Sequence, residues 1–133
     1  MGYHYLNARN ACYAYSEAIG VPMNNVPNCV RDANALESAL DRPRQSAIYE
    51  NASISRQAAT LFWGVIKNHP FLDGNKRTAL VITDLFLRAN GFTFAATEDE
   101  QFALAIEVAE HNESVDLVEH WFDLHLEPYH LEE

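Results

Sequence analysis

Cysteine is scarce, long apolar runs are absent, and no lysine or arginine follows Arg88. The two cysteines, Cys12 and Cys29, have no second Cys or His pair at the spacing of zinc ligands, which excludes a zinc site of that kind. A domain of this size needs no disulfide, so we interpret both as reduced thiols. No apolar run approaches the roughly 18 residues that cross a bilayer, and the N-terminus lacks the charged and hydrophobic regions of a secretion signal. We therefore expect a soluble, cytoplasmic protein with no membrane partner.

The charges are distributed unevenly along the chain. The net charge is -10, yet all nine Lys and Arg residues lie in residues 1–92, and residues 93–133 hold twelve acidic residues. A nucleic-acid binder needs a basic surface to neutralise phosphates, so the composition argues against nucleic acid as a partner. The acidic segment is most simply a set of solvated helix faces; an acidic surface for a basic partner is the alternative.

Length and helical patterns predict one all-α domain over residues 1–133. The chain has 133 residues, 48% of them hydrophobic, which suffices for one domain with its own core. Caps, breakers and apolar periodicity predict helices over residues 7–19, over a short segment after Asp32, from Ser55 to just before Pro70, over 75–89, from Thr97 onward, and over 115–124. Residues 75–89 are apolar on nearly every side, so this helix is expected at the centre of the bundle.

Residues 42–53 look least helical. They contain Pro43 and a polar pair, and Ile48 and Tyr49 could form a short strand or hairpin there. We therefore predict a small flap in this segment.

The segment HPFLDGNKR, residues 69–77, joins two predicted helices and resembles an anion-binding turn. The first backbone N–H groups of a helix lack intrahelical partners and carry the positive end of its dipole, so a loop ending in Gly74 would let an anion approach them. Lys76 and Arg77 place cations where the dipole disfavours them, by up to about 1 kcal/mol each. That arrangement is expected if an anion binds there; solvated surface charges are the alternative.

His69 and Asp73 add candidate chemistry to this turn. Histidine changes charge near neutral pH and can accept a proton from an incoming hydroxyl. Asp73 is placed to hold a divalent ion that bridges phosphates. The structural alternatives are a loop histidine with a local hydrogen bond and a turn aspartate before a helix.

HPFLDGNKR resembles the signature of the Fic/Doc superfamily, and more closely that of its Doc (death-on-curing) branch, in which a lysine occupies the second small position of the motif. Two flanking segments, RDANALESALDRPRQ (31–45) and TALVITDLFLRANGF (78–92), also resemble Doc-like proteins. The resemblance implies a Fic/Doc-type helical bundle with a central buried helix and a short β-hairpin-like flap, here at residues 42–53.

The resemblance also implies a site and a reaction. The implied roles are general base for His69, Mg²⁺ ligand for Asp73, anion-binding turn for Gly74 and Asn75, and phosphate clamp for Lys76 and Arg77. Typical Fic enzymes carry H-P-F-x-x-G-N-G-R-x-x-R and transfer AMP from ATP to a protein hydroxyl. Here Lys76 replaces the second glycine and Leu80 replaces the last arginine.

Doc-type toxins bind the nucleotide in the inverted direction, so the resemblance implies transfer of the terminal phosphate of ATP to a protein hydroxyl. It also implies a translation factor such as elongation factor Tu as the target, and a small antitoxin whose disordered tail folds into a groove near the site. AMP transfer, or a Fic-fold binding module with little turnover, are the alternatives.

One further match lies in the predicted flap. SAIYEN, residues 46–51, fits the S/T-x-x-x-E-G/N pattern by which many Fic enzymes inhibit themselves. In those enzymes the glutamate pairs with the last arginine of the motif, which is Leu80 here. We therefore interpret the match as coincidental.

Overall fold

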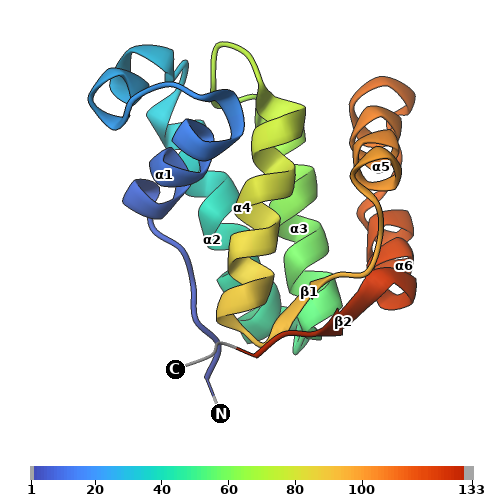
Figure 1. The fold of residues 1–133 in the computed structure, drawn as a ribbon. Coiled ribbons are helices and arrows are strands. Elements are labelled where there is room, and N and C mark those ends of the chain that lie inside the picture. Colours follow the sequence, from blue (N-terminus) through green and yellow to red (C-terminus); the bar gives the residue numbers. More distant parts are fainter. Residues whose placement is uncertain (1, 131–133) are drawn as a thin grey trace.

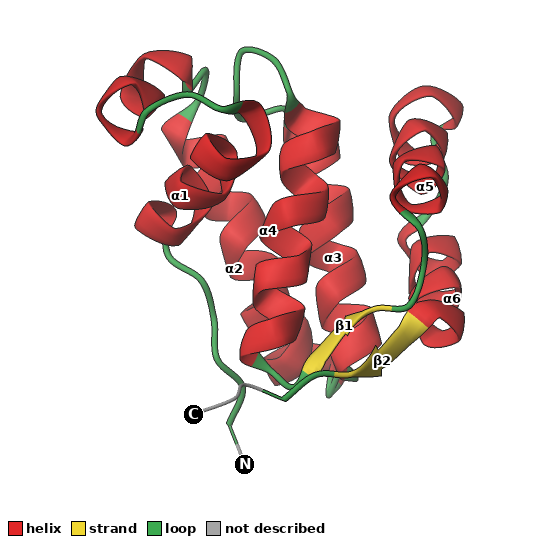
Figure 2. Ribbon diagram, viewed as in Figure 1, coloured by secondary structure: helices red, strands yellow, loops and turns green. Residues whose placement is uncertain are grey.

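In the computed structural model, which describes residues 2–130, helices account for most of the chain (Figure 1, Figure 2). The elements, in order, are α1 (Ala8–Ile19), the 3-10 helix η1 (Met23–Cys29), α2 (Ala33–Glu50), α3 (Ile54–Asn68), α4 (Asn75–Ala89), β1 (Phe92–Phe94), α5 (Glu98–His111), α6 (Val115–His125) and β2 (Leu126–Pro128). The predicted helical bundle is confirmed. Within residues 2–130, no helix combines the length and the apolar character needed to cross a membrane.

Polar side chains fix where most helices begin. The side chain of an N-cap residue accepts a hydrogen bond from a backbone N–H of the first turn in α1, α2, α3, α5 and α6, the caps being Asn7, Asp32, Ser53, Thr97 and Ser114. The capping box of Thr97 and Glu100 is present as predicted. Local sequence therefore sets these boundaries.

Helix α4 lies at the centre of the bundle, as predicted. It packs against α1, α3 and α5 (Figure 1). Its fully buried apolar side chains are Ala79, Ile82, Phe86 and Leu87. Burial is not uniform around the helix, however, because Leu80, Val81 and Leu85 are only half-buried. The side of α4 that carries these three residues is therefore only partly covered by the rest of the protein.

The flap predicted at residues 42–53 is wrong. Helix α2 is not a short helix but continues through Pro43 to Glu50, and Ile48 and Tyr49 are exposed on its last turn. A proline inside a helix removes one backbone hydrogen bond and crowds the preceding turn. The local sequence therefore disfavours a helix that continues through Pro43.

Packing against α3 overrides that signal. The buried residues of α2 recur at helical spacing on both sides of the proline, at Leu36, Ala39, Leu40, Pro43 and Ser46. Keeping the helix intact buries this whole stripe against α3, the neighbour with which α2 makes its most extensive contact.

The strands lie elsewhere, at positions that the sequence did not predict. β1 and β2 pair antiparallel, with Thr93 opposite Glu127. Figure 2 shows this small sheet at the end of the bundle opposite the α3–α4 connection. The pairing fastens the end of α6 to the end of α4.

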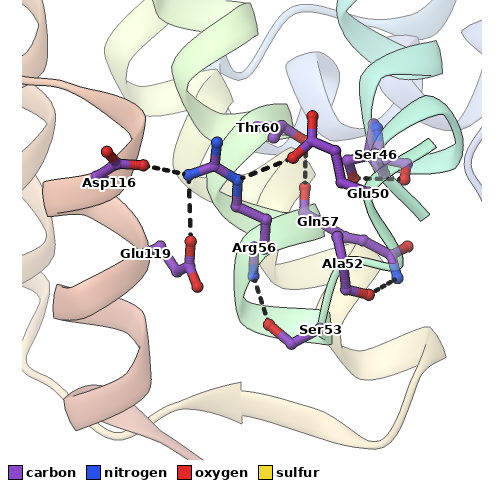
Figure 3. Close-up of polar contacts among 10 residues, drawn as sticks. Ser46, Glu50, Ala52, Ser53, Arg56, Gln57, Thr60, Asp116 and Glu119 are labelled. Carbon is purple, nitrogen blue, oxygen red and sulfur yellow. Dashed lines mark hydrogen bonds and ion pairs between the residues drawn. The ribbon is translucent and has the colours of Figure 1, made fainter. Parts of the chain in front are cut away.

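Arg56, in the first turn of α3, links three helices (Figure 3). Its guanidinium lies 3.6 Å from Glu50 of α2, 2.6 Å from Asp116 of α6 and 3.2 Å from Glu119 of α6. Glu50 is the glutamate of the SAIYEN match. Because Arg56 and His69 lie at opposite ends of α3, roughly 20 Å apart at 1.5 Å per residue, Glu50 is held far from the HPFLDGNKR turn. This placement agrees with a coincidental match.

Candidate functional site

The residues HPFLDG form the connection between α3 and α4, at one end of the bundle (Figure 1). Helix α3 ends before Pro70, as predicted. His69 is the C-cap of α3, with φ 51° in the left-handed region, and its N–H donates to the Val65 carbonyl over 3.2 Å. A residue other than glycine is strained there by about 1–2 kcal/mol. Other contacts must therefore hold His69 in place.

Arg31 supplies those contacts. Its Nε donates to the His69 carbonyl over 2.6 Å and its Nη2 to the Asn68 carbonyl over 2.8 Å. The backbone N–H groups of Arg31 and Asp32 both donate to the Pro70 carbonyl. Hydrogen bonds from a guanidinium are stronger than neutral ones, so the segment before α2 offsets the strain at His69.

Asn75 closes the turn on itself. Its Oδ1 accepts a hydrogen bond from the Phe71 N–H over 3.0 Å, and its Nδ2 donates to the Phe71 carbonyl over 2.9 Å. The side chain is only 5% exposed. The Asn75 side chain therefore shapes the turn, which leaves its backbone N–H as the group that can face an anion.

Gly74 is required by both conformation and space. Its φ of 74° lies in the left-handed region, and a Cβ at this position would lie 2.5 Å from Cδ1 of Ile19. Unlike the other α-helices, α4 has no side-chain N-cap, and its first backbone hydrogen bond runs from the Thr78 N–H to the Gly74 carbonyl. The N–H groups of the first turn are thus open to a ligand.

All the residues that the sequence predicts for the site line one cavity of about 780 Å³: His69, Asp73, Gly74, Asn75, Lys76 and Arg77. Lys67, from the last turn of α3, lines the same cavity, and Phe102, Ala109 and Glu110 of α5 form another part of its wall. The tertiary fold therefore forms a pocket around the motif. The contribution of α5 to its wall was not predicted.

Cationic side chains outnumber carboxylates on the cavity wall, with Lys67, Lys76 and Arg77 against Asp73 and Glu110. Within residues 2–130, no ion pair involves Lys76 or Arg77. Lys67 donates to Oδ1 of Asn112 and lies over the Trp63 ring. Together with the open N-terminus of α4, these cations favour a phosphate-bearing ligand.

Tyr15 of α1 reaches the site from the core. It is 1% exposed, its ring stacks on Phe71 with 4.4 Å between centroids, and its hydroxyl donates to Oδ1 of Asp73 over 3.3 Å. Burial raises the pKa of Tyr15, and neighbouring Cys29 and Asp73 raise it further. The hydroxyl is therefore protonated, and able to donate, at neutral pH.

Sequence reasoning missed Tyr15, Arg31 and Lys67. Lys67 lies two residues before the motif, and its position at the end of a predicted helix could have suggested it. Tyr15 is separated from Asp73 by 58 positions. A single sequence contains no signal for such a contact.

Asp73 carries the one carboxylate of the turn, the type of ligand that Mg²⁺ prefers. Within residues 2–130 there is no group of three or more side chains suited to hold a metal ion. Mg²⁺ is often bound by only one or two carboxylates, with phosphates and water as its other ligands. One carboxylate beside the open N-terminus of α4 fits a Mg²⁺ ion that would arrive with a nucleotide.

A second cavity of about 630 Å³ adjoins the first. Arg77 and Phe102 line both. Leu80, which stands where typical Fic enzymes have the last arginine of the motif, lines this second cavity together with Arg88. The open side of α4 therefore faces a cavity with both apolar and charged walls.

Solved structures include similar proteins of Bartonella. The N-terminal Fic domain of a putative cell filamentation protein from Bartonella quintana, with bound ADP, is 22% identical with a TM-score of 0.49, over 71% of this chain and 48% of that one. BepC from Bartonella tribocorum, with bound AMPPNP, is 19% identical with the same TM-score, over 71% of this chain and 50% of that one. The chain thus spans about half the length of these proteins. Similarity this low says nothing about the chemistry of the site.

The comparisons of sequence are more specific. The model of the Fic/DOC family matches residues 5–87, which include the whole of α1 to α3, the motif turn and most of α4. Toxin Doc of Mycolicibacterium smegmatis is 36% identical over 98 residues, which is 71% of each chain. The chain therefore belongs to the Fic/DOC family.

Proposed function

We propose that this protein is a Doc-type toxin that transfers the terminal phosphate of ATP to a hydroxyl group of a target protein. The observation on which this choice rests is the pair Lys76 and Leu80. Lys76 lines the phosphate cavity at the position of a glycine in typical Fic enzymes, and Leu80 lies on the wall of the neighbouring cavity. The 36% identity to Toxin Doc supports the same choice.

The cavity suits a nucleotide in size and charge. Its volume of about 780 Å³ falls within the range of roughly 300–1,000 Å³ that is usual for small-molecule sites. The open N–H groups of α4, with Lys76 and Arg77, would bind the phosphates. Bound Mg²⁺, with Asp73 as its protein ligand, would supply further neutralisation of phosphate charge.

In the proposed reaction, His69 accepts the proton of the target hydroxyl while that oxygen attacks the γ-phosphorus of ATP. The bond between the γ-phosphorus and the β–γ bridging oxygen breaks, and ADP leaves with the bridging oxygen. Lys76, Arg77 and the α4 N-terminus stabilise the charge on the phosphates during transfer.

Two residues of α4 disfavour AMP transfer. That reaction needs the β- and γ-phosphates deep in the turn so that the α-phosphate faces His69. In this chain the Lys76 side chain occupies the small position of the motif, and apolar Leu80 cannot bind the γ-phosphate as the usual arginine does. The inverted nucleotide, with its terminal phosphate beside His69, is compatible with both residues.

Labelled ATP tests the proposal directly. Purified elongation factor Tu, the expected target, is incubated with the protein, Mg²⁺ and ATP labelled at either the α or the γ position. We expect label from γ-labelled ATP only. Label from the α position would establish AMP transfer instead. No label from either, in purified target and in bacterial extract, would favour the binding module.

A restored motif provides the matched variant for this assay. Lys76→Gly combined with Leu80→Arg recreates the pattern of typical Fic enzymes, and Leu80 is half-buried at a cavity wall, where an arginine can be accommodated. If the two residues select the inverted nucleotide, this variant loses γ-transfer. Unchanged γ-transfer would show that the direction of the nucleotide is set elsewhere.

The partner of such a toxin is expected to be a small antitoxin, and both would act in the cytoplasm. The second cavity is the place we propose for its tail. It adjoins the first, shares Arg77 with it, and combines apolar walls with charged ones. A segment bound there would lie beside the phosphate-binding turn and could block it.

A further inference from the structure

Asp73 has one side-chain partner within residues 2–130, and that partner comes from α1, 58 positions earlier in the chain. The Tyr15 hydroxyl donates to Oδ1 of Asp73 over 3.3 Å. This is longer than the usual 2.7–2.8 Å for hydrogen bonds between oxygens, so the contact is a weak tether. Asp73 itself is exposed and sits in the short connection between α3 and α4.

Tyr15 is held much more firmly than Asp73. It ranks among the largest fully buried side chains, and its ring stacks on Phe71 at an interplanar angle of 21°. Phe71 is in turn fixed by the Asn75 side chain through its N–H and its carbonyl. The Tyr15 hydroxyl is therefore held in a fixed position beside the turn, where its hydrogen bond limits rotation of the Asp73 carboxylate.

We propose that Tyr15 is a positioning residue, whose hydroxyl orients the Asp73 carboxylate to bind the Mg²⁺ ion that accompanies the nucleotide. The inference rests on the proposed function, because it requires a nucleotide at this turn. Partners that hydrogen-bond a ligating carboxylate hold it in position, and their loss typically lowers metal affinity. The hydroxyl engages one oxygen of Asp73, which leaves Oδ2 for the ion.

Tyr15→Phe separates this role from packing, because it removes the hydroxyl and keeps the stacked ring. The variant is titrated with AMPPNP by calorimetry, once with excess MgCl2 and once with EDTA. We expect the affinity in MgCl2 to fall about two- to tenfold, the range for loss of one ordinary hydrogen bond, and the affinity in EDTA to stay unchanged. An equal loss in both conditions would mean that the hydroxyl only supports the shape of the turn.

Tyr5→Phe is the matched control. Its hydroxyl also makes one side-chain hydrogen bond, to Oε1 of Gln57 over 2.9 Å, but neither residue lines the nucleotide cavity. This variant should bind AMPPNP as the wild type does in both conditions. Thermal unfolding of both variants checks that each is folded.

Asp73→Asn distinguishes failure of the inference from failure of the proposed function. If Asp73 binds Mg²⁺, this variant loses the gain in affinity that MgCl2 gives, and adding Tyr15→Phe to it has no further effect. A wild type that gains nothing from MgCl2, or an Asp73→Asn variant that keeps the gain, would overturn both the metal site and the inference. If Asp73→Asn loses the gain while Tyr15→Phe keeps it, the inference alone is overturned.

Discussion

At the scale of single residues, the backbone of His69 explains how a short turn can present the imidazole that we propose as the general base. Its left-handed conformation turns the chain sharply at the end of α3, and Arg31 fixes the carbonyls of Asn68 and His69. His69 is therefore held through its backbone N–H and carbonyl and not through its imidazole. The side chain is left available for proton transfer.

Replacement of His69 by alanine should separate catalysis from binding. We expect His69→Ala to abolish transfer and to leave the affinity for AMPPNP nearly unchanged, because phosphate binding is assigned to the α4 N-terminus, Lys76 and Arg77. Labelled transfer and calorimetry measure the two properties. If both are lost, His69 belongs to the nucleotide-binding surface and the proposed division of roles is wrong.

Gly74 should be sensitive to substitution for two reasons that can be measured separately. Gly74→Ala places a residue with a Cβ at φ 74° and drives that Cβ against Ile19. Gly20→Ala is the control, because Gly20 has φ 84° but open space around its Cβ position. We expect roughly 1 kcal/mol of destabilisation at Gly20 from conformation alone, and about 1–3 kcal/mol more at Gly74, by urea unfolding. Equal losses of stability at both positions would mean that the Ile19 side chain moves aside without cost.

At the scale of elements, α2 shows that tertiary packing can outweigh a helix-breaking residue, here Pro43. Its apolar stripe continues past Pro43 against α3, and burial of that stripe offsets the lost backbone hydrogen bond. Residues 42–50 of the segment that the resemblance assigns to a flap are therefore helical here. A proline in a helix interior is about 3 kcal/mol less favourable than alanine.

This cost gives a test of the continuous helix. Pro43→Ala restores a backbone donor and relieves crowding in the turn before it, while it loses part of a buried ring. We expect a net gain of about 1–2 kcal/mol in the free energy of unfolding. A loss of stability would show that packing of the Pro43 ring outweighs the cost of a proline inside the helix.

At the scale of the whole molecule, the acidic C-terminal third is bound to the bundle at several points. β1 pairs with β2, Trp63 donates from its indole N–H to the Glu113 carbonyl, and Arg56 bridges α2, α3 and α6 (Figure 3). These links place α5 opposite the α4 N-terminus. Without them the cavity would lose its second wall.

The Arg56 bridge should have a measurable, salt-dependent effect on stability. Its side chain is 26% exposed, whereas Arg44, paired with Asp41 at 3.9 Å, is 57% exposed. We expect Arg56→Met to lower the free energy of unfolding by about 1 kcal/mol at low salt and less at high salt, and Arg44→Met by roughly 0–0.5 kcal/mol. Equal effects of the two substitutions would argue against a bridge of this kind.

The sequence by itself determined most helix boundaries, and it predicted the residues of the candidate site that line one cavity in the structure. Caps such as Asp32 and Thr97, and the breaker Pro70, act on neighbouring backbone, so a local pattern suffices to read them. The site was visible for the same reason, because the residues from His69 to Arg77 follow one another along the chain.

Only the tertiary structure decided the course of α2, the α5 wall of the cavity and the contacts of Arg31 and Tyr15. Each depends on surfaces that meet from distant parts of the chain. At Pro43, burial against α3 outweighs a local preference. At Tyr15, a hydroxyl reaches Asp73 across 58 positions. Such contacts follow from how helices pack, and neither periodicity nor spacing in one sequence records them.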